Sequence, residues 1–216
     1  MTADLERGLR EGLADLGLDL ADAQVSQLLA YQALIAKWNQ VYNLTAVRDP
    51  QEMLTHHLLD SLAVVLPLRQ HLAGRTTLLD VGSGAGLPGV VLAITCPDLT
   101  VTCVDTVAKK AAFIQQVAVS LGLPHLKGLH ARVETLPGPY DVISSRAFSS
   151  LPDFVKGSRQ GLAPQGVWMA MKGKRPQEEL AALPVDVDVF HVEPLTVPDL
   201  SAERCIVWMR LAAQDS

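Results

Sequence analysis

A glycine-rich turn between a predicted strand and a predicted helix is the feature that most constrains the fold of this chain. The turn is the stretch Asp80-Val-Gly-Ser-Gly-Ala-Gly-Leu-Pro-Gly89. The apolar run 77–79 before it is typical of a short buried strand, and the run 90–94 after it is typical of a buried helix. Glycines permit a tight turn and let a ligand approach the backbone, while a helix N-terminus offers free N–H groups. The stretch therefore predicts a ligand-binding turn in an α/β fold.

The spacing of the glycines indicates which cofactor binds there. A dinucleotide fingerprint has its third glycine three positions after the second, but that position is Leu87 here. The pattern Asp-x-Gly-x-Gly-x-Gly instead resembles motif I of Rossmann-like S-adenosylmethionine (SAM) methyltransferases. In addition, the predicted strand 101–104 ends at Asp105, whose carboxylate can accept hydrogen bonds from both ribose hydroxyls. A plain structural turn is the alternative to a SAM site formed by Gly82, Gly84, Gly86 and Asp105.

The composition is that of a globular chain with one sizeable core. Of its 216 residues 49% are hydrophobic, and no apolar run reaches membrane-spanning length. Residues 1–7 lack the apolar core of a signal peptide, so we expect a cytoplasmic protein. Nothing in the sequence requires a protein partner or more than a monomer. The cysteines form no CxxC pair, and we expect buried thiols and no metal site from Cys96, Cys103 and Cys205.

The first seventy or so residues carry helix signals and no strand signal. Leucines at spacings of three and four predict an amphipathic helix over 1–18, and an apolar stripe predicts a second helix over 22–40. Asp49, directly followed by a proline, predicts the N-cap of a third helix that should end before Pro67. The domains we predict are an N-terminal helical cap over 1–72 and a SAM-dependent methyltransferase domain over 73–216.

From residue 77 onward, predicted strands alternate with predicted helices, which implies a mostly parallel sheet. The last two strands have no helix between them and suggest an antiparallel closing pair. Seven strands with this ending match the Rossmann-like class I SAM-dependent methyltransferase fold, an α/β class, whereas a dinucleotide enzyme usually ends differently. The remaining predicted elements are strands over 126–133, 140–144, 166–172, 185–192 and 204–211, and helices over 108–121, capped by Thr106, and 152–162.

Basic residues are predicted to collect at the edge of the sheet where ligands bind, beyond the carboxyl ends of the strands. The net charge of −5 argues against a general nucleic-acid binder, so a cluster of cations at one edge is informative. Arg204 begins the last strand and shares this edge if that strand runs antiparallel. For Lys174 and Arg175, ordinary solvated charges explain the pattern equally well. The predicted cationic mouth comprises Arg146, Lys172, Lys174, Arg175 and Arg204.

The residues after the fourth predicted strand limit the reaction. They read Ser144-Ser-Arg-Ala-Phe148, without the Asn/Asp-Pro-Pro-aromatic tetrad of exocyclic-amine methyltransferases and without a nearby nucleophilic cysteine. No metal-ligand cluster of the kind that catechol-type enzymes need is evident. A substrate atom that needs no deprotonation fits best, and guanine N7 is such an atom because its lone pair is free. Phe148 is a candidate for stacking on a flipped base, although a core aromatic is the commoner role.

Ordered blocks along nearly the whole chain carry a resemblance to one family. They are Trp38-Asn-x-x-Tyr42-Asn-Leu-Thr45, His57-x-x-Asp60-Ser, the glycine turn, Arg132-Val-Glu134, Ser145-Arg-Ala-Phe148 and Met171-Lys-Gly173. These blocks closely resemble the RsmG (GidB) family. The resemblance implies a SAM-dependent methyltransferase that acts on guanine N7 in the decoding-region loop of 16S rRNA. The small ribosomal subunit would then be its partner.

The resemblance also implies roles for individual residues. Asp105 matches the ribose-binding acid of the wider class, and Arg146 is the candidate orienting residue, with no side chain expected as an obligatory general base. His57 and Asp60 lie three apart on a helix, so a buried structural pair is the alternative for them. The family's cofactor contacts fall on Gly82, Leu87, Val133, Glu134 and Arg146, and the predicted RNA contacts are Asn43, Arg48, His57, Lys172 and Arg204.

Two other functions remain open from the sequence. A small-molecule SAM-dependent methyltransferase with the helical cap as a lid would turn over a free metabolite without ribosomal particles. A non-catalytic SAM-binding regulator of ribosome assembly would bind the cofactor and transfer nothing.

Overall fold

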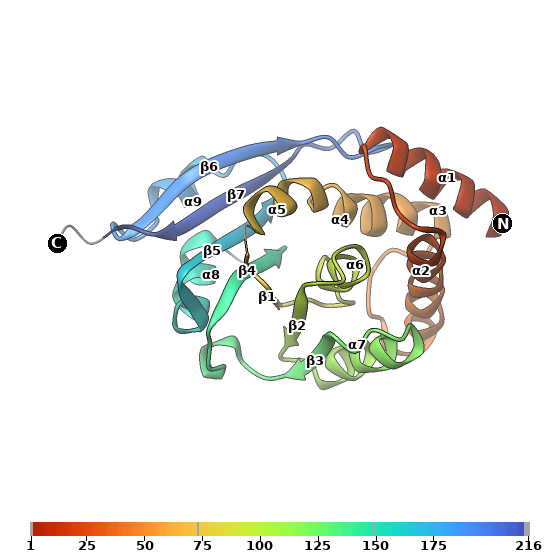
Figure 1. Cartoon of the computed structure of the whole chain (residues 1–216), viewed down its shortest axis with the longest axis horizontal. Coiled ribbons are helices and arrows are strands. Elements are labelled where there is room, and N and C mark those ends of the chain that lie inside the picture. Colours follow the sequence, from red (N-terminus) through yellow and green to blue (C-terminus); the bar gives the residue numbers. More distant parts are fainter. Residues whose placement is uncertain (1, 73, 149, 214–216) are drawn as a thin grey trace.

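A seven-stranded sheet in the order β3-β2-β1-β4-β5-β7-β6 forms the centre of the molecule (Figure 1). The computed structural model describes residues 2–72, 74–148 and 150–213. Strands β1 to β5 run parallel, and β7 is antiparallel to both β5 and β6, which confirms the predicted sheet and its closing pair. The strands are β1 (Thr77–Val81), β2 (Thr100–Asp105), β3 (Leu126–His130), β4 (Tyr140–Arg146), β5 (Leu162–Lys172), β6 (Val187–Leu195) and β7 (Arg204–Leu211).

The two faces of the sheet bury different sets of side chains. Leu78 and Val142 belong to the core under α6, α7 and the N-terminal helices, whereas their neighbours Leu79 and Ile143 belong to the core under α8. Successive strand residues point to opposite faces, so a strand covered on both sides reads as a continuous apolar run. The main helices are α1 (Thr2–Asp15), α2 (Asp22–Tyr42), α5 (Val65–Leu72), α6 (Gly89–Thr95), α7 (Ala108–Ser120), α8 (Leu151–Ser158) and α9 (Gln177–Ala181).

A composite helix connects α2 to α5. Asp49 caps it as predicted, since its side chain accepts hydrogen bonds from the backbone N–H groups of Gln51 and Glu52. The chain then leaves regular α-helical geometry for a π-helical turn before it returns to it. The composite helix consists of α3 (Pro50–Met53), the π-helical turn η1 (Leu54–Leu59) and α4 (Asp60–Leu62).

Some predicted boundaries are wrong for identifiable reasons. The third helix ends at Leu62 and so does end before Pro67, but the sequence did not predict the separate helix α5, which begins at Val65. Pro67 is the third residue of α5, a position whose N–H would have no partner within the helix. The strand predicted over 126–133 ends at His130, which pairs with the last residue of β2, and Val133 lies in the short 3-10 turn η2 (Val133–Thr135).

The helices that precede β3 and β5, α7 and α8, also differ from the prediction. Thr106 does not cap α7: the N-cap is Val107, and its backbone N–H binds the carboxylate of Asp105 instead. The helix predicted to reach residue 162 ends at Ser158, continues as the 3-10 turn η3 (Arg159–Gly161), and gives way to β5 at Leu162, which pairs with β4.

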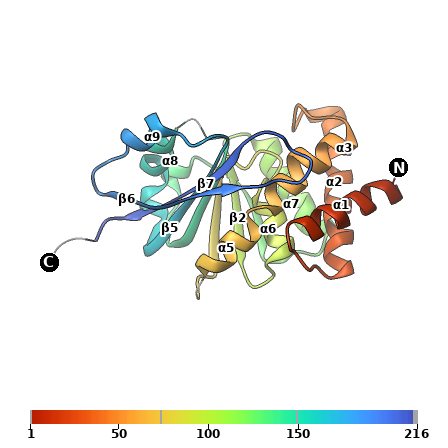
Figure 2. The ribbon, with the colours of Figure 1, turned by 90° about the horizontal axis from the view of Figure 1, so that it is seen from above.

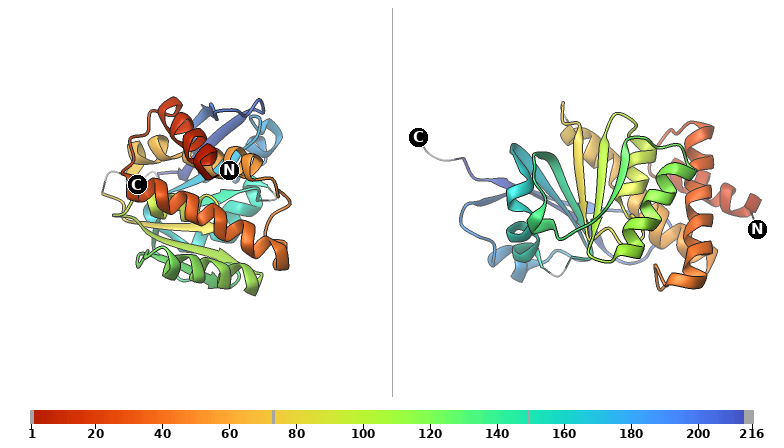
Figure 3. Two further views of the ribbon diagram at one scale, coloured as in Figure 1. Left: turned by 90° about the vertical axis from the view of Figure 1, so that its right-hand side faces the viewer. Right: turned by 90° about the horizontal axis from the view of Figure 1, so that it is seen from below.

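The N-terminal helices share a core with the sheet. Figure 2 shows α1, α2 and α3 together at one end of the molecule, and α2 packs against α6 and α7 (Figure 3). Leu28 of α2 and Phe113 of α7 lie in one hydrophobic cluster, and the Gln24 amide donates to the Ile94 carbonyl at 2.8 Å. The helical cap is thus packed onto the α/β part by both apolar and polar contacts. No helix of the described residues is long and apolar enough to cross a membrane.

Tyr31 connects α2 directly to the glycine turn. Its side chain is fully buried, and its hydroxyl donates to the carbonyl oxygen of Ala85 at 2.6 Å. The next residue, Gly86, has a φ of +94°, and a Cβ there would lie 3.3 Å from Tyr31 Oη and 2.4 Å from Val90 Cγ2. The turn and the helix are therefore fitted to each other, and only glycine suits position 86.

We expect Tyr31→Phe to lower the free energy of unfolding by about 1–3 kcal/mol, because the Ala85 carbonyl loses this hydrogen bond inside the core. Urea denaturation followed by circular dichroism measures the change. Tyr42→Phe is the matched control on the same helix, since the Tyr42 side chain is exposed, and it should change the free energy by no more than about 0.5 kcal/mol. Equal effects in the two variants would contradict a stabilising role for the Tyr31 hydroxyl.

Candidate functional site

A pocket of about 300 Å³ lies at the carboxyl ends of β1 and β2. We call it the turn pocket. Four residues predicted to contact the cofactor line it together, from three separate segments of the chain. Ligands of parallel sheets bind at this edge, so the position agrees with a cofactor site. These four residues are Gly82, Asp105, Val133 and Glu134.

Asp105 holds the glycine turn against the start of α7. One carboxylate oxygen accepts the N–H of Gly84 at 3.0 Å, and the other accepts the N–H of Val107 at 2.8 Å. The ammonium of Lys110 lies 3.7 Å from the first oxygen. A carboxylate has about four acceptor positions, so Asp105 keeps acceptor capacity for hydroxyl groups of a ligand in the turn pocket. This donor and acceptor pattern fits a ribose.

The conformation of Gly82 keeps the turn pocket open. Its φ is +64°, which side-chain-bearing residues rarely adopt, and a Cβ built there would face the ring of Phe148 at 3.8 Å. Both residues line the turn pocket, so any larger side chain at position 82 would occupy ligand space. A ligand in the turn pocket can therefore approach the backbone closely at Gly82.

The other four predicted cofactor residues, Gly84, Gly86, Leu87 and Arg146, lie outside the lining of the turn pocket. Gly86 is buried against Tyr31 and Val90, which accounts for glycine there by packing. Leu87 is also buried in the core. Contacts of these residues with the cofactor stay predictions.

Asp80 is a fully buried clamp beneath the turn. Its carboxylate accepts the hydroxyl of Ser144 at 2.8 Å and the backbone N–H of Gly89 at 3.1 Å. It thereby ties β1 to β4 and to the first residue of α6. Burial raises the pKa of Asp80 to about 7, although both hydrogen bonds favour the charged form. A Cβ at Gly89 would come within 2.4 Å of Cys103 Sγ, so glycine is required here as well.

A second pocket of about 380 Å³ adjoins the first. We call it the arginine pocket. Phe148 lines both pockets, and it lies against Phe154 with ring centroids 5.6 Å apart. The antiparallel register pairs Lys172 with Cys205, which brings the start of β7 to the end of β5 as predicted. The residues that line the arginine pocket are His56, Asp60, Arg146, Ala147, Phe148, Met171, Lys172, Gly173 and Arg204.

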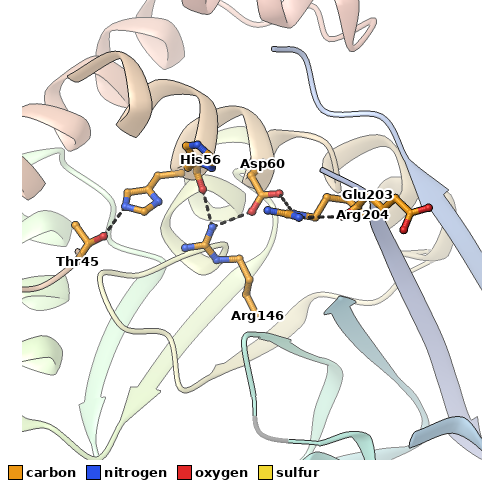
Figure 4. Close-up of polar contacts among 7 residues, drawn as sticks. Thr45, His56, Asp60, Arg146, Glu203 and Arg204 are labelled. Atoms are coloured by element: carbon orange, nitrogen blue, oxygen red, sulfur yellow. Dashed lines mark hydrogen bonds and ion pairs between the residues drawn. The ribbon is translucent and has the colours of Figure 1, made fainter. Parts of the chain in front are cut away.

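One carboxylate binds two of the arginines in this pocket. Arg146 Nη1 donates to Asp60 Oδ2 and to the carbonyl of His56, both at 2.9 Å, and Arg204 Nε donates to Asp60 Oδ1 at 2.8 Å (Figure 4). The Asp60 side chain is only 4% exposed. Asp60 therefore pairs with arginines and not with His57, contrary to the alternative of a His–Asp pair.

The predicted cationic mouth is offset by carboxylates. Besides the two arginines on Asp60, Lys172 Nζ lies 2.7 Å from Glu179 Oε2. Lys174 and Arg175 are exposed beside this pair. The basic residues do gather at one edge, as predicted. Asp60 of α4 and Glu179 of α9 neutralise much of their charge, since a partly buried cation is costly without an acidic partner.

The predicted RNA residues on the N-terminal side lie at different depths. Asn43, with a φ of +47°, accepts a hydrogen bond from Arg48 at 2.7 Å, and both residues are exposed. His57 is only 6% exposed, and its Nε2 lies 2.7 Å from Thr45 Oγ1. Burial lowers the pKa of His57 below its ordinary value. His57 thus supports the loop that carries Asn43 and Arg48.

Sequence reasoning did not assign Asp60 or His56 to the site. The available signal was an acid inside the apolar run 58–65, since a charge buried among leucines needs a partner. The backbone carbonyl of His56 carries no sequence signal, because its orientation depends on the π-helical turn. Within the described ranges, no group of three or more His, Cys, Asp or Glu residues could hold a metal ion.

The chain is similar to one protein family over most of its length. Residues 24–207 match the family described as rRNA small subunit methyltransferase G, or GidB. The ribosomal RNA small subunit methyltransferase G of Acidovorax ebreus (strain TPSY) is 67% identical, over 97% of this chain and 96% of that protein. The protein of the same name from Polaromonas sp. (strain JS666 / ATCC BAA-500) is 68% identical, over 95% of this chain and 93% of that one.

Solved structures show the same fold. A SAM-dependent methyltransferase from Aquifex aeolicus superposes with a TM-score of 0.54 at 19% identity, over 76% of this chain and 94% of that one. TrmN from Thermus thermophilus superposes with a TM-score of 0.56, also at 19% identity, over 73% of this chain and 53% of that chain. These similarities establish the Rossmann-like methyltransferase fold predicted from the sequence.

The raised pKa of Asp80 predicts a pH-dependent stability. An aspartate in an unfolded chain ionises near pH 3.9, so the folded state binds the proton more tightly, and the associated stability is complete below about pH 4. That stability is lost as the pH rises through about 7, by roughly 4 kcal/mol in total. Asp80→Asn imitates the neutral form and should escape this loss.

Urea denaturation of both proteins between pH 4 and pH 8 measures this difference. We expect the variant to gain up to about 4 kcal/mol relative to the wild type as the pH rises, with little further change above about pH 8. A difference in free energy of unfolding that stays constant over this range would show that Asp80 does not titrate as its burial implies.

Proposed function

The chain belongs to the rRNA small subunit methyltransferase G (GidB) family, and we propose that it transfers a methyl group from SAM to N7 of one guanine in the decoding-region loop of 16S rRNA. The family match supports this function, and the SAM-dependent methyltransferase fold supports the cofactor. The observation that carries the proposal is the turn pocket opening beside the arginine pocket, with Phe148 lining both.

The turn pocket is the proposed cofactor site. Bound SAM supplies the methyl group as an electrophile. Asp105 binds the ribose hydroxyls, while Gly82 and Gly84 allow close approach of the backbone. Val133 provides an apolar wall. The remaining proposed cofactor contacts are Gly86, Leu87, Glu134 and Arg146.

The arginine pocket is the proposed site of the target guanine. Its N7 lone pair needs no base, so the chain has to align the atom with the methyl group and exclude water. Arg146 orients the base, and the half-buried ring of Phe148 offers a face for stacking. Lys172 and Arg204 bind the neighbouring RNA backbone.

Further RNA contacts come from the loop after α2. Asn43 and Arg48 are exposed and can bind RNA directly, whereas buried His57 acts by holding Thr45 in place. We further propose that residues 1–72 serve as an RNA-facing cap on the methyltransferase domain, 73–216. The enzyme would act as a monomer in the cytoplasm, where it meets the small ribosomal subunit, without a protein partner.

The alternative of a small-molecule enzyme with a mobile lid receives less support. A lid must separate from the cofactor site, but α2 is bonded to the glycine turn through Tyr31 and to α6 through Gln24. Opening would break these hydrogen bonds and expose the shared core.

Radiolabelled methyl transfer from SAM to unmodified small ribosomal subunits, with free 16S rRNA in parallel, tests the proposed function. N7-directed strand cleavage then maps the label. We expect label at a single guanine, and the comparison shows which form of the RNA is the substrate. Label at another atom would refute the N7 assignment. Absence of label with SAM binding confirmed by calorimetry would favour the small-molecule enzyme or the non-catalytic regulator.

A pair of glycine variants tests the cofactor site. Gly82 and Gly122 share a φ of +64°, but only Gly82 lines the turn pocket, and none of the described residues comes within 4 Å of a Cβ at Gly122. Alanine at either position should lower the free energy of unfolding by about 1–2 kcal/mol through backbone strain. Only Gly82→Ala should weaken SAM binding, by about tenfold, in calorimetry. Equal SAM affinity of the two variants would place the cofactor elsewhere.

A further inference from the structure

Asp60 has a position that the proposed reaction does not explain. It lies at the start of α4, directly after the π-helical turn, and its carboxylate is almost completely buried. Both of its oxygens are used: Oδ2 accepts from Arg146 and Oδ1 accepts from Arg204 (Figure 4). A buried carboxylate is costly unless its partners are well placed, and here Arg146 and Arg204 both supply that pairing.

The two arginines come from different parts of the sheet and have different proposed roles. Arg146 ends β4 and is the proposed cofactor and base contact, whereas Arg204 begins β7 and is a proposed RNA contact. Each retains donors for other partners, because a guanidinium has five N–H groups. Arg146 uses Nη1 for Asp60 and the His56 carbonyl, and Arg204 uses Nε for Asp60 and Nη1 for the Glu203 carbonyl.

We propose that Asp60 is a positioning residue that couples the RNA side of the site to the cofactor side. Arg204 fixes the carboxylate of Asp60, and Asp60 in turn fixes the guanidinium of Arg146. RNA that binds the remaining donors of Arg204 would hold this chain of contacts still and strengthen cofactor binding. By linkage, bound cofactor would strengthen RNA binding to the same extent. This inference rests on the proposed contacts of Arg146 and Arg204.

Lys172 offers a matched control for Arg204. It lines the same pocket and carries the same charge, and it also has a carboxylate partner. That partner is Glu179 of α9, which makes no contact with Asp60 among the interactions of the described residues. A purely electrostatic effect on the cofactor would therefore appear in variants of both cations, whereas coupling through Asp60 would appear only at Arg204.

Calorimetric SAM binding without any RNA provides the test. We expect Arg204→Gln to raise the dissociation constant for SAM about threefold or more, because Asp60 and hence Arg146 lose their fixed orientation. Lys172→Gln should leave this constant within about 1.5-fold of the wild type. Thermal unfolding of both variants checks that they fold. Equal SAM affinity of Arg204→Gln and Lys172→Gln would overturn the proposal.

A double-mutant cycle assigns the coupling to Asp60. In an Asp60→Asn background, Arg204→Gln should change SAM affinity less than about 1.5-fold, because the connecting carboxylate is absent. An unchanged threefold effect in that background would overturn the proposal. If Asp60→Asn does not fold, the comparison of Arg204→Gln with Lys172→Gln decides alone. Since no RNA is used, failure of methyl transfer to ribosomal subunits would refute the proposed function without affecting this result.

Discussion

Two buried carboxylates that accept backbone N–H groups determine the shape of the glycine turn, and the rest of the site depends on that shape. Asp80 accepts from Gly89 at the end of the turn, and Asp105 accepts from Gly84 in its middle. The turn contains three glycines with positive φ, so it has many conformations available when unfolded. The hydrogen bonds to Asp80 and Asp105, which lie on strands of the sheet, select one of these conformations. The sheet thus acts as a rigid frame, and the turn pocket is a consequence of where β1 and β2 end.

The N-terminal helices complete this frame. The turn has the sheet on one side and α2 on the other, and the hydroxyl of Tyr31 donates a hydrogen bond to the Ala85 carbonyl of the turn. Apolar contacts between α2, α6 and α7 hold the hydroxyl in place. A helix that contributes to the core in this way resists rigid-body movement, because opening would expose buried apolar surface. The helical cap therefore serves both as a support for the turn and as the origin of the loop that carries Asn43 and Arg48.

The sequence allowed prediction of features whose causes are local. The glycine turn, the N-cap at Asp49 and the antiparallel closing pair all follow from residue types at short spacing, and all are confirmed. The π-helical turn could not be predicted, because it replaces one hydrogen-bonding pattern with another without a proline or glycine to mark it. The partners of Asp60 could not be predicted either: Arg204 is 144 positions away, and only the complete fold brings the two together.

The pairing of cations with acids affects how the proposed RNA site can recognise RNA. Arg146 and Arg204 are already paired with Asp60, and the chain as a whole is acidic. The protein therefore attracts RNA less strongly at long range than it would if these two arginines were free. In return, guanidinium groups held in place lose less conformational freedom when a phosphate or a base binds to their remaining donors. Recognition then relies on fit between a preorganised surface and one RNA shape more than on total charge. Such a site favours selectivity for one structured RNA over general affinity, as the proposed reaction at a single guanine requires.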